Sequence, residues 1–350
     1  MHNIKWIREH PEEFDAGLKK RGIPAEVASA EQILLGDKEK RALQNELQRL
    51  QQASNQLAKE IGALKSKGED ATAQLEESKQ LKARLQEAEA ALKALPTLEG
   101  EGADFLAETL ASLPNLPAPE VPFGKDENDN VELRRWGTPP TFSFPPKQHF
   151  DLGEALGLMN FEQTAKLSGS RFVTLHGPLA RLERALAAFM LDMHTREFGY
   201  TEVSPPLLVR EDALFGTGQL PKFKEDMFLV AKSIPASAEG PSRLEHTHYL
   251  ISTAEISLTN LVREQILEEE QLPLRFTALT PCFRSEAGAA GKDTRGMLRQ
   301  HQFYKVELVS ITTPEASEEE HERMTSIAET VLQRLGLPYR VMLLCSQDRR

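Results

Sequence analysis

The residues best suited to chemistry lie between Pro281 and Val309, where two short strand-like runs flank a long loop rich in glycine, alanine and charged residues. A period of two places alternate residues of each run on one face. That face carries Cys282, Arg284, Glu286, His301, Phe303, Lys305 and Glu307. The opposite face of the second run carries Tyr304, Val306 and Leu308. An ordinary half-buried hairpin would instead direct apolar residues inward and charges outward.

These side chains have complementary binding properties. A guanidinium holds a phosphate or carboxylate through two parallel hydrogen bonds, an aromatic ring offers a surface to a flat base, and a carboxylate pairs with an ammonium group. The pattern therefore predicts a floor that holds a nucleotide and an amine together. A charged hairpin that only faces solvent is the alternative, which the pattern alone leaves open.

The amino-acid sequence of this segment resembles that of a known protein family. The run FRSE at 283–286, the loop, and the run RQHQFYKVE at 299–307 resemble motif 2 of the class II aminoacyl-tRNA synthetases, in the form found in bacterial-type seryl-tRNA synthetases. The resemblance extends from the first residues to about Cys345. It implies an α+β fold, in which an N-terminal antiparallel helical coiled-coil arm precedes a class II antiparallel sheet core flanked by helices.

The resemblance implies two adjoining sites. Its serine site comprises Thr253, Ala254, Glu255, Arg284 and Glu307. Its ATP site comprises Arg284, Ser285, Glu286, Arg299 and Phe303. In the family, the arginine of FRSE holds the α-phosphate and the serine carboxylate, its glutamate orients adenine, the phenylalanine stacks on adenine, and the last glutamate takes the serine ammonium group. By pattern alone, Ser252-x-x-Glu255 is also a capping box, and the two interpretations are compatible.

The implied reaction is the ATP-dependent activation of L-serine to seryl-adenylate, followed by transfer of serine to the 3′ end of tRNA(Ser) and, by the same resemblance, tRNA(Sec). Mg²⁺ would bridge phosphate oxygens, and no metal site built from protein side chains is expected. The loop Ala287–Leu298 would reach the acceptor end of the tRNA. Two alternatives stay open: a non-catalytic synthetase remnant or tRNA-binding paralogue, and a structural coiled-coil adaptor.

The segment from about Asp37 to Leu95 predicts a helical hairpin. Apolar residues recur at steps of three and four, which builds a narrow seam that must find a partner. The first series is Leu43, Leu47, Leu50, Ser54, Leu57, Ile61 and Leu64, and the second is Ser78, Leu81, Leu85, Ala88, Leu92 and Leu95. Between them, Gly68 can end one helix, and Asp70 or Thr72 can cap the next. This break favours an intramolecular hairpin over a dimerising coiled coil.

Charge suggests a purpose for this arm. The outward half from Lys38 to Lys67 has a net charge of +4, although the chain as a whole has a net charge of −11. A basic stripe suits contact with tRNA phosphates, or it is only a solvated face of the coiled coil. In the family the matching arm grips the long variable arm of the tRNA, which favours the first interpretation. The predicted tRNA-binding residues are Lys38, Lys40, Arg41, Arg49, Lys59, Lys65 and Lys67.

We divide the chain into an N-terminal tRNA-binding arm at 1–110 with its hairpin at about 37–95, a proline-rich linker at 111–127, and a catalytic core at 128–350. Within the core, the helical spacing of 180–199 and the strand of 200–209, broken by Pro205 and Pro206, resemble motif 1. In this class motif 1 forms a homodimer interface. From spacing alone, packing inside one subunit is an equal alternative.

Composition excludes several classes of protein. The charged N-terminus has no apolar core of a secretory signal, and no apolar run approaches the length of about 20 residues that spans a bilayer. The two cysteines, Cys282 and Cys345, lie in different blocks, which argues against a disulfide framework or a cysteine-rich zinc site. His246 and His248 could be a metal pair, but no carboxylate or thiolate lies nearby at ligand spacing, and they are better explained as strand residues. A cytoplasmic protein is expected.

The resemblance stops near Cys345. In the family a TGD run and a further segment that contains motif 3 follow, whereas this chain reads CSQDRR from Cys345 to Arg350. We therefore expect a C-terminally incomplete core that lacks motif 3, and no charging of tRNA by the 350 residues as written.

Overall fold

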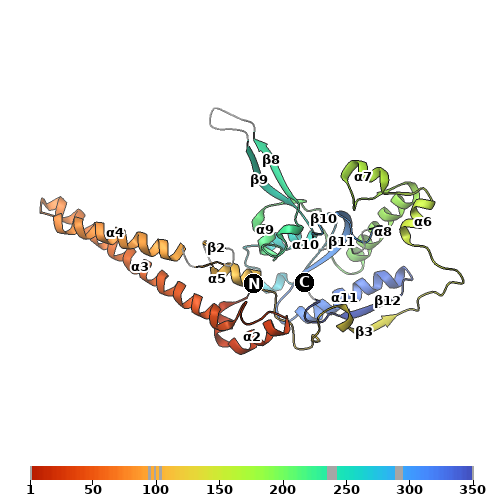
Figure 1. The fold of residues 1–350 in the computed structure, drawn as a ribbon, viewed down its shortest axis with the longest axis horizontal. Coiled ribbons are helices and arrows are strands. Elements are labelled where there is room, and N and C mark those ends of the chain that lie inside the picture. The colour runs from red at the N-terminus through yellow and green to blue at the C-terminus, as the bar shows by residue number, and fades with distance from the viewer. Residues whose placement is uncertain are drawn as a thin grey trace. The chain divides into compact units, whose positions relative to one another are not determined.

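The computed structural model describes residues 2–93, 96–97, 100–101, 105–234, 243–287 and 295–348. The chain divides into two compact units, whose elements are labelled in Figure 1. The first unit contains Met1–Leu133 together with Met342–Arg350, and the second contains Arg134–Val341.

The first unit is mainly helical. Its elements are α1 (Ile4–Glu9), α2 (Pro11–Lys20), α3 (Ala30–Lys67), α4 (Thr72–Lys93), β1 (Pro96–Thr97), β2 (Gly100–Glu101), α5 (Phe105–Ser112), the 3₁₀ helix η1 (Glu127–Asp129) and the start of β3 (Val131–Trp136). Its apolar core gathers side chains from α1, α2, α5 and the first turn of α3. The fully buried members include Ile7, Phe14, Leu18 and Ile33.

Helix α3 begins earlier than the seam pattern indicates. The hydroxyl of Ser29 accepts a hydrogen bond from the Gln32 N–H at 3.3 Å, which caps the helix. Ala30 and Ile33, in the first turn, are buried in the core of the unit. The helix is therefore rooted in the core before its seam begins, and this explains why a prediction based on the seam alone starts too late.

Helices α3 and α4 lie side by side and antiparallel (Figure 1), as predicted. Every predicted seam position of α3 is buried or half-buried, and so is every predicted seam position of α4 from Ser78 to Leu92. Leu95 lies outside the described residues. Arg84 of α4 pairs with Glu46 of α3 at 3.4 Å. The seam of α3 is therefore covered by the same chain, which is the hairpin and not the dimerising coiled coil.

The turn between the two helices has the predicted chemistry. Gly68 takes a left-handed conformation with φ 72°, which a residue with a Cβ rarely adopts. Its N–H and that of Glu69 donate to the carbonyls of Lys65 and Leu64, which closes the last turn of α3. One carboxylate oxygen of Asp70 accepts from the Thr72 N–H at 3.0 Å and from the Thr72 hydroxyl at 2.6 Å, which starts α4.

Asp37 ties the base of the arm to α1. Its side chain is only 6% exposed, and its two oxygens accept from Arg8 Nε at 3.0 Å and Arg8 Nη2 at 2.9 Å, while Arg41 Nη2 lies 2.9 Å away. Burial by itself would raise the pKa of Asp37, but the hydrogen bonds and charges of the two arginines outweigh it, so the pKa is lowered. The carboxylate is therefore favoured in the folded state.

We predict that Asp37→Asn lowers the free energy of unfolding by about 1–3 kcal/mol at neutral pH, because hydrogen bonds to a charged group are lost. A lowered folded-state pKa gives stability that is present above the unfolded-state pKa and is lost as pH falls through the folded-state pKa. Urea unfolding should therefore show a difference between variant and wild type that shrinks at acid pH. Glu39→Gln, an exposed change on the same helix, serves as the control. A difference that is constant with pH would contradict the assignment.

The second unit combines small sheets with helices. Its elements are the end of β3, α6 (His149–Ala155), β4 (Met159–Asn160), α7 (Glu162–Ser168), β5 (Thr174–Leu175), α8 (Gly177–Arg196), β6 (Thr201–Glu202), β7 (Leu208–Val209), α9 (Glu211–Gly216), η2 (Lys224–Asp226), β8 (Leu229–Ile234), β9 (Arg243–Leu250), α10 (Ala254–Thr259), η3 (Asn260–Val262), η4 (Glu269–Gln271), β10 (Leu274–Phe283), β11 (Gln302–Ile311), α11 (Ser317–Arg334) and most of β12 (Tyr339–Leu343). The sheets have the strand orders β11-β10-β6, β7-β9-β8, β4-β5 and β12-β3.

The long antiparallel pair β10 and β11 is the centre of this unit. It runs from Leu274 opposite Ile311 to Phe283 opposite Gln302, and β6 adds to β10 in parallel. Ala254 and Leu258 of α10 pack with Ala278 and Val309 in one apolar cluster, which fixes α10 against the pair. As predicted, the segment 200–209 is not one strand, because β6 ends before Pro205 and β7 begins after Pro206.

A buried ion pair joins α11 to this sheet. Arg275 Nε and Nη2 donate to the two oxygens of Glu320 at 2.8 and 2.7 Å, and the Ser310 hydroxyl donates to the same carboxylate at 2.8 Å. The hydrogen bonds from Arg275 outweigh burial and lower the pKa of Glu320. Glu320 therefore stays ionised in a place where its side chain is only 8% exposed.

Other predictions concern single residues. Cys282 and Cys345 are free thiols, and both are buried. His246 and His248 lie in β9, opposite Ala231 and Val230. Within the part of the chain that the structure describes, no helix is both long enough and apolar enough to cross a membrane.

Candidate functional site

The register of β10 and β11 brings the predicted floor together. Cys282 lies opposite Phe303, Thr280 opposite Lys305, and Ala278 opposite Glu307. The three β10 residues are small and at most 1% exposed, whereas the three β11 residues are half-buried. Small residues on β10 thus support the larger functional side chains of β11, which share one face because they are two residues apart.

Glu307 is the best-connected carboxylate of this floor. Its oxygens accept from the Thr253 hydroxyl at 2.8 and 2.7 Å and from the Ala254 N–H at 2.8 Å. The ammonium group of Lys305 donates to Glu307 at 2.7 Å and to the Thr253 hydroxyl at 2.7 Å. Two predicted serine-binding residues are therefore in direct contact with a third. Lys305 was placed on this face by the period of two but was not predicted as a site residue.

Glu255 adds a second carboxylate to this group. Its side chain is exposed, and its carboxyl lies close enough to Glu307 and Lys305 to feel their charges. The pKa of Glu255 is raised, first by burial and then by the negative charge of Glu307, against the opposing charge of Lys305. Two carboxylates and one lysine leave a net charge of −1. One further ammonium group would balance it, which suits an amino-acid substrate.

Arg284 lies just beyond the end of β10, so the ladder is continued by loop residues. The Arg284 N–H donates to the His301 carbonyl at 3.0 Å, and His301 Nδ1 lies 3.0 Å from the Arg284 carbonyl. A carbonyl oxygen can only accept, so Nδ1 carries the hydrogen. The Arg284 guanidinium carbon lies 5.3 Å from the centre of the Phe303 ring, and Nε donates to the Ser252 carbonyl at 3.3 Å. A fixed cation and a flat ring are thus neighbours.

Glu286 departs from the predicted strand alternation. Its φ of 53° is left-handed, a conformation that costs a non-glycine residue of the order of 1–3 kcal/mol. Its carboxylate pairs with Arg299 Nη1 at 3.1 Å, so two predicted ATP-site residues are in contact. Its carbonyl accepts from Arg171 Nη1 at 3.3 Å. The backbone leaves the strand at this point and directs Glu286 independently of the sheet.

Residues far away in sequence hold this turn. The Ser285 N–H donates to the carbonyl of Asp226 at 2.9 Å, and the Ala287 N–H donates to the Asp226 carboxylate at 2.9 Å. The carbonyl of Arg171, which also has a left-handed φ of 60°, accepts from the His301 N–H at 3.0 Å. The sequence prediction missed both Asp226 and Arg171. The period of two continues through FRSE in the sequence, so it gave no sign of this turn.

The loop Ala287–Leu298 is described only at its two ends, because residues 288–294 lie outside the described residues. Its second end is anchored to α6. Arg295 lies 3.6 Å from Asp151 and 3.7 Å from Glu154, and its guanidinium lies 4.5 Å from the centre of the Phe150 ring. The Met297 N–H donates to His149 Nε2 at 2.8 Å.

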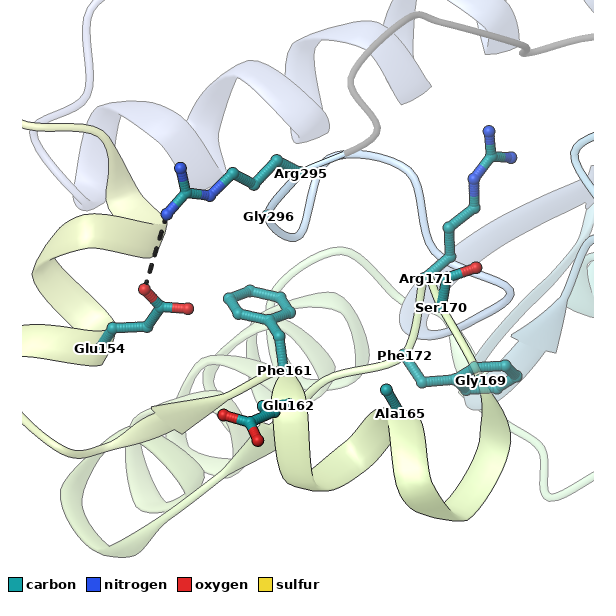
Figure 2. A pocket seen from close by; sticks show the side chains of 10 residues that line it. All are labelled: Glu154, Phe161, Glu162, Ala165, Gly169, Ser170, Arg171, Phe172, Arg295 and Gly296. Atoms are coloured by element: carbon teal, nitrogen blue, oxygen red, sulfur yellow. Dashed lines mark ion pairs between the residues drawn. The ribbon is translucent and has the colours of Figure 1, made fainter.

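A pocket of about 280 Å³ adjoins this anchor. Figure 2 shows it between the Arg295–Glu154 pair on one side and Arg171 with Phe172 on the other, and Phe161 points into the space between them. The remaining lining residues are Glu162, Ala165, Gly169, Ser170 and Gly296. The pocket therefore lies beside the anchored end of the loop and not over the floor of β10 and β11.

The predicted tRNA-binding residues belong to the other unit. All seven lie on α3, where they are exposed except for Lys40, which is half-buried. Arg41 also pairs with Asp37. The structure thus gives a cationic helix and a polar floor as two separate sets of residues.

The basic residues of α3 and the floor of β10 and β11 both lie in segments that match known protein domains. Residues 1–117 match the seryl-tRNA synthetase N-terminal domain, and residues 237–350 match the class II tRNA synthetase core domain (G, H, P, S and T). The serine–tRNA ligase of Rhodospirillum centenum is 56% identical over 351 residues, which cover 99% of this chain and 76% of that protein. The chain belongs to the seryl-tRNA synthetase family.

Solved structures of the family agree with the fold. Seryl-tRNA synthetase from Pyrococcus horikoshii, complexed with ATP, superimposes with a TM-score of 0.78 at 37% identity, covering 99% of this chain and 78% of that one. The cytoplasmic serine–tRNA ligase of Naegleria fowleri, in complex with AMP, superimposes with a TM-score of 0.73 at 25% identity and covers 99% and 74% of the two chains. The predicted class, a helical arm followed by a class II core, is confirmed.

The raised pKa of Glu255 gives a prediction for this member of the family. As pH falls below neutral, Glu255 takes up a proton earlier than an ordinary carboxyl group, and the net charge of its cluster rises from −1 to zero. The KM for serine should therefore rise on mild acidification, and Glu255→Gln should abolish this rise while increasing KM at neutral pH. Serine-dependent pyrophosphate exchange at a series of pH values measures it. Glu269→Gln, an exposed carboxylate in η4, is the control, and an identical pH profile in both variants would contradict the prediction.

Proposed function

We propose that this chain is a serine–tRNA ligase, which activates L-serine with ATP and transfers it to tRNA(Ser). The observation that carries the proposal is the 56% identity to serine–tRNA ligases along 99% of the chain, which includes both the arm and the floor of β10 and β11. The charge of the floor fits the two substrates. We extend the acceptor to tRNA(Sec) on the resemblance described above.

The serine site is proposed around Glu307. Its carboxylate would take the substrate ammonium group, with Glu255 as a second negative charge and with Thr253 and Ala254 fixing the carboxylate through the hydrogen bonds described. Lys305 now pairs with Glu307 and would share it with the substrate. The net charge of −1 on Glu255, Lys305 and Glu307 supports this assignment, because one further ammonium group would balance it.

The ATP site is proposed around Arg284 and Phe303. The ring would carry adenine on its face, an interaction of about 1–3 kcal/mol by analogy with other bases on aromatic rings. The guanidinium would bridge the α-phosphate and the serine carboxylate, with Arg299 as a second phosphate contact. Glu286 would orient adenine, and Ser285 belongs to the same turn. The contacts of Arg284 with Ser252 and His301 support a fixed position.

The chemistry follows from position and charge. The serine carboxylate attacks the α-phosphorus in line, a P–O bond forms, and the bond to pyrophosphate breaks. The Arg284 guanidinium, already fixed, stabilises the negative charge that develops on the phosphoryl oxygens. No proton has to move in this step, so no general base is required. The activated seryl group then passes to the 3′-terminal adenosine of the tRNA, and AMP leaves.

ATP is proposed to enter as its Mg²⁺ complex. In the described part of the chain, no three His, Cys, Asp or Glu side chains gather into a group that could hold a metal. Mg²⁺ on nucleotides is usually held chiefly by phosphate oxygens and water. Its charge would add to that of Arg284 on the phosphates.

The tRNA and partner-subunit surfaces are proposed from separate elements. The basic residues of α3 would contact tRNA phosphates, and the loop Ala287–Leu298 would reach the acceptor end. A second copy of the chain would pair through α8 and β6, the segments that resemble motif 1. The division into an arm at 1–110, a linker at 111–127 and a core at 128–350, and a cytoplasmic location, complete the proposal.

Pyrophosphate exchange with the purified chain tests the activation step. The exchange should depend on serine. Glu307→Ala should cost about 3–5 kcal/mol of transition-state stabilisation, which lowers kcat/KM by roughly 150- to 5,000-fold, since the substrate ammonium loses its buried counter-charge. Glu318→Ala, an exposed change on α11, is the control. Exchange that is absent in the wild type would favour the non-catalytic tRNA-binding alternative, and near-normal exchange in the variant would contradict the role of Glu307. Charging of tRNA(Ser) in the same preparation tests the transfer step.

The arm gives an independent prediction. Replacing Arg49 and Lys59 on α3 with Ala should weaken binding of tRNA(Ser) and reduce the slope of log K against log salt concentration by about 2, because two phosphate contacts are lost. Filter binding or anisotropy at several salt concentrations measures both. Replacing Lys79 and Lys82 on α4 with Ala removes the same charge from the other helix. An equal loss in both double variants would show that overall charge, and not the stripe on α3, controls binding.

A further inference from the structure

Glu286 is a residue whose conformation must be imposed from outside. It carries the adenine contact in the proposed function, yet its φ of 53° is unfavourable for a residue with a side chain. Such conformations persist only where the surrounding structure fixes them. The two N–H groups that flank it, those of Ser285 and Ala287, donate to a single residue, Asp226.

Asp226 uses two chemically different acceptors for this purpose. Its main-chain carbonyl accepts from Ser285 at 2.9 Å, and its carboxylate oxygen Oδ1 accepts from Ala287 at 2.9 Å. The Ala287 bond holds the peptide group that follows Glu286, and the Ser285 bond holds the peptide group between Arg284 and Ser285, so the turn is held on both sides of Glu286. An Asp–backbone bond of this kind is charge-assisted and stronger than a neutral one.

Asp226 is itself firmly held. It ends the 3₁₀ helix η2, and its N–H donates to the Phe223 carbonyl at 3.0 Å. The next residue, Met227, is buried in an apolar cluster that includes Leu214 and Ile251. The carbonyl of Ile251 accepts from the Phe283 N–H at 2.9 Å, so the same cluster also holds the end of β10. Asp226 and the start of the Glu286 turn are thus fixed to one rigid support.

The other contacts of Glu286 leave its recognition capacity intact. Arg171 donates to its carbonyl, and Arg299 donates to one carboxylate oxygen, Oε2. A carboxylate has about four acceptor positions, so it can bind Arg299 and the exocyclic amine of adenine together. Whether the adenine amine can donate to the Glu286 carboxylate therefore depends on where the turn places that carboxylate.

We propose that Asp226 is a positioning residue that selects adenine, by holding the turn at Glu286 so that its carboxylate meets the exocyclic amine of the base. This proposal rests on the proposed function of the site. Inosine triphosphate carries a carbonyl where ATP carries the amine, and a fixed carboxylate rejects it because two acceptors then face each other. A turn that is free to move loses this discrimination.

The experiment compares the binding of ATP with that of inosine triphosphate by calorimetry, in the wild-type chain and three variants. Asp226→Ala should reduce the preference for ATP by about 10- to 100-fold, since displacements near 1 Å can cost about 100-fold. Asp226→Asn should retain most of the preference, because its amide oxygen still accepts from Ala287. Glu225→Ala, the exposed neighbour in η2, should match the wild type. The ratio of the two affinities is independent of the fraction of folded protein, so partial unfolding cannot imitate the effect.

The outcomes separate this proposal from the proposed function. An unchanged preference in Asp226→Ala would overturn the positioning role, and so would an equal loss in Asp226→Asn, which would trace the effect to charge. Equal binding of the two nucleotides by the wild type would also overturn it. A wild-type chain that prefers ATP but shows no serine-dependent pyrophosphate exchange would count against the ligase function and leave the role of Asp226 standing.

Discussion

The site depends on the pairing register of β10 and β11. With Ala278 opposite Glu307 and Cys282 opposite Phe303, all functional side chains of the second strand share one face. A slip of one residue would turn Glu307, Lys305 and Phe303 to the other face, because side chains alternate with a period of two. The register is secured from outside the ladder by α10, whose Ala254 and Leu258 pack against Ala278 and Val309. The packing of this apolar cluster therefore fixes the face on which Phe303, Lys305 and Glu307 lie.

Charge compensation is the second constraint on this fold. Glu307 has Lys305, Glu320 has Arg275, and Asp37 has Arg8, each at hydrogen-bonding distance. Removing one partner from such a pair costs more than the pair contributes, since a charge without compensation is left in a poorly solvated place. Asp37 and Glu320 each meet two arginines, because Arg41 also pairs with Asp37 and Arg323 also pairs with Glu320, and these groups serve structure. The group around Glu307 keeps one negative charge in excess once Glu255 is counted, and this excess fits the proposed binding of a substrate ammonium group.

The two units match different domains of the seryl-tRNA synthetase family. The first matches the N-terminal domain of seryl-tRNA synthetases, and the second contains most of the segment that matches the class II core. The arm needs only a long helix with a covered seam, which local heptads and a capped turn supply. The core needs strands from distant parts of the chain at fixed positions. Each therefore depends on a different physical principle, and each can be tested by itself.

The sequence by itself determined the features that depend on local periodicity. The seam of the arm, its turn at Gly68 and the shared face of Phe303, Lys305 and Glu307 all follow from steps of three, four or two residues, and the structure has them. Tertiary structure decided the direction of Glu286, and together with the local cap at Ser29 it decided the start of α3. Ser29 and Ala30 begin the helix because a core formed with α1 and α2 receives it. Glu286 leaves the strand because Asp226, 61 residues from Ala287 in the chain, holds its neighbours, and no local pattern records so distant a contact.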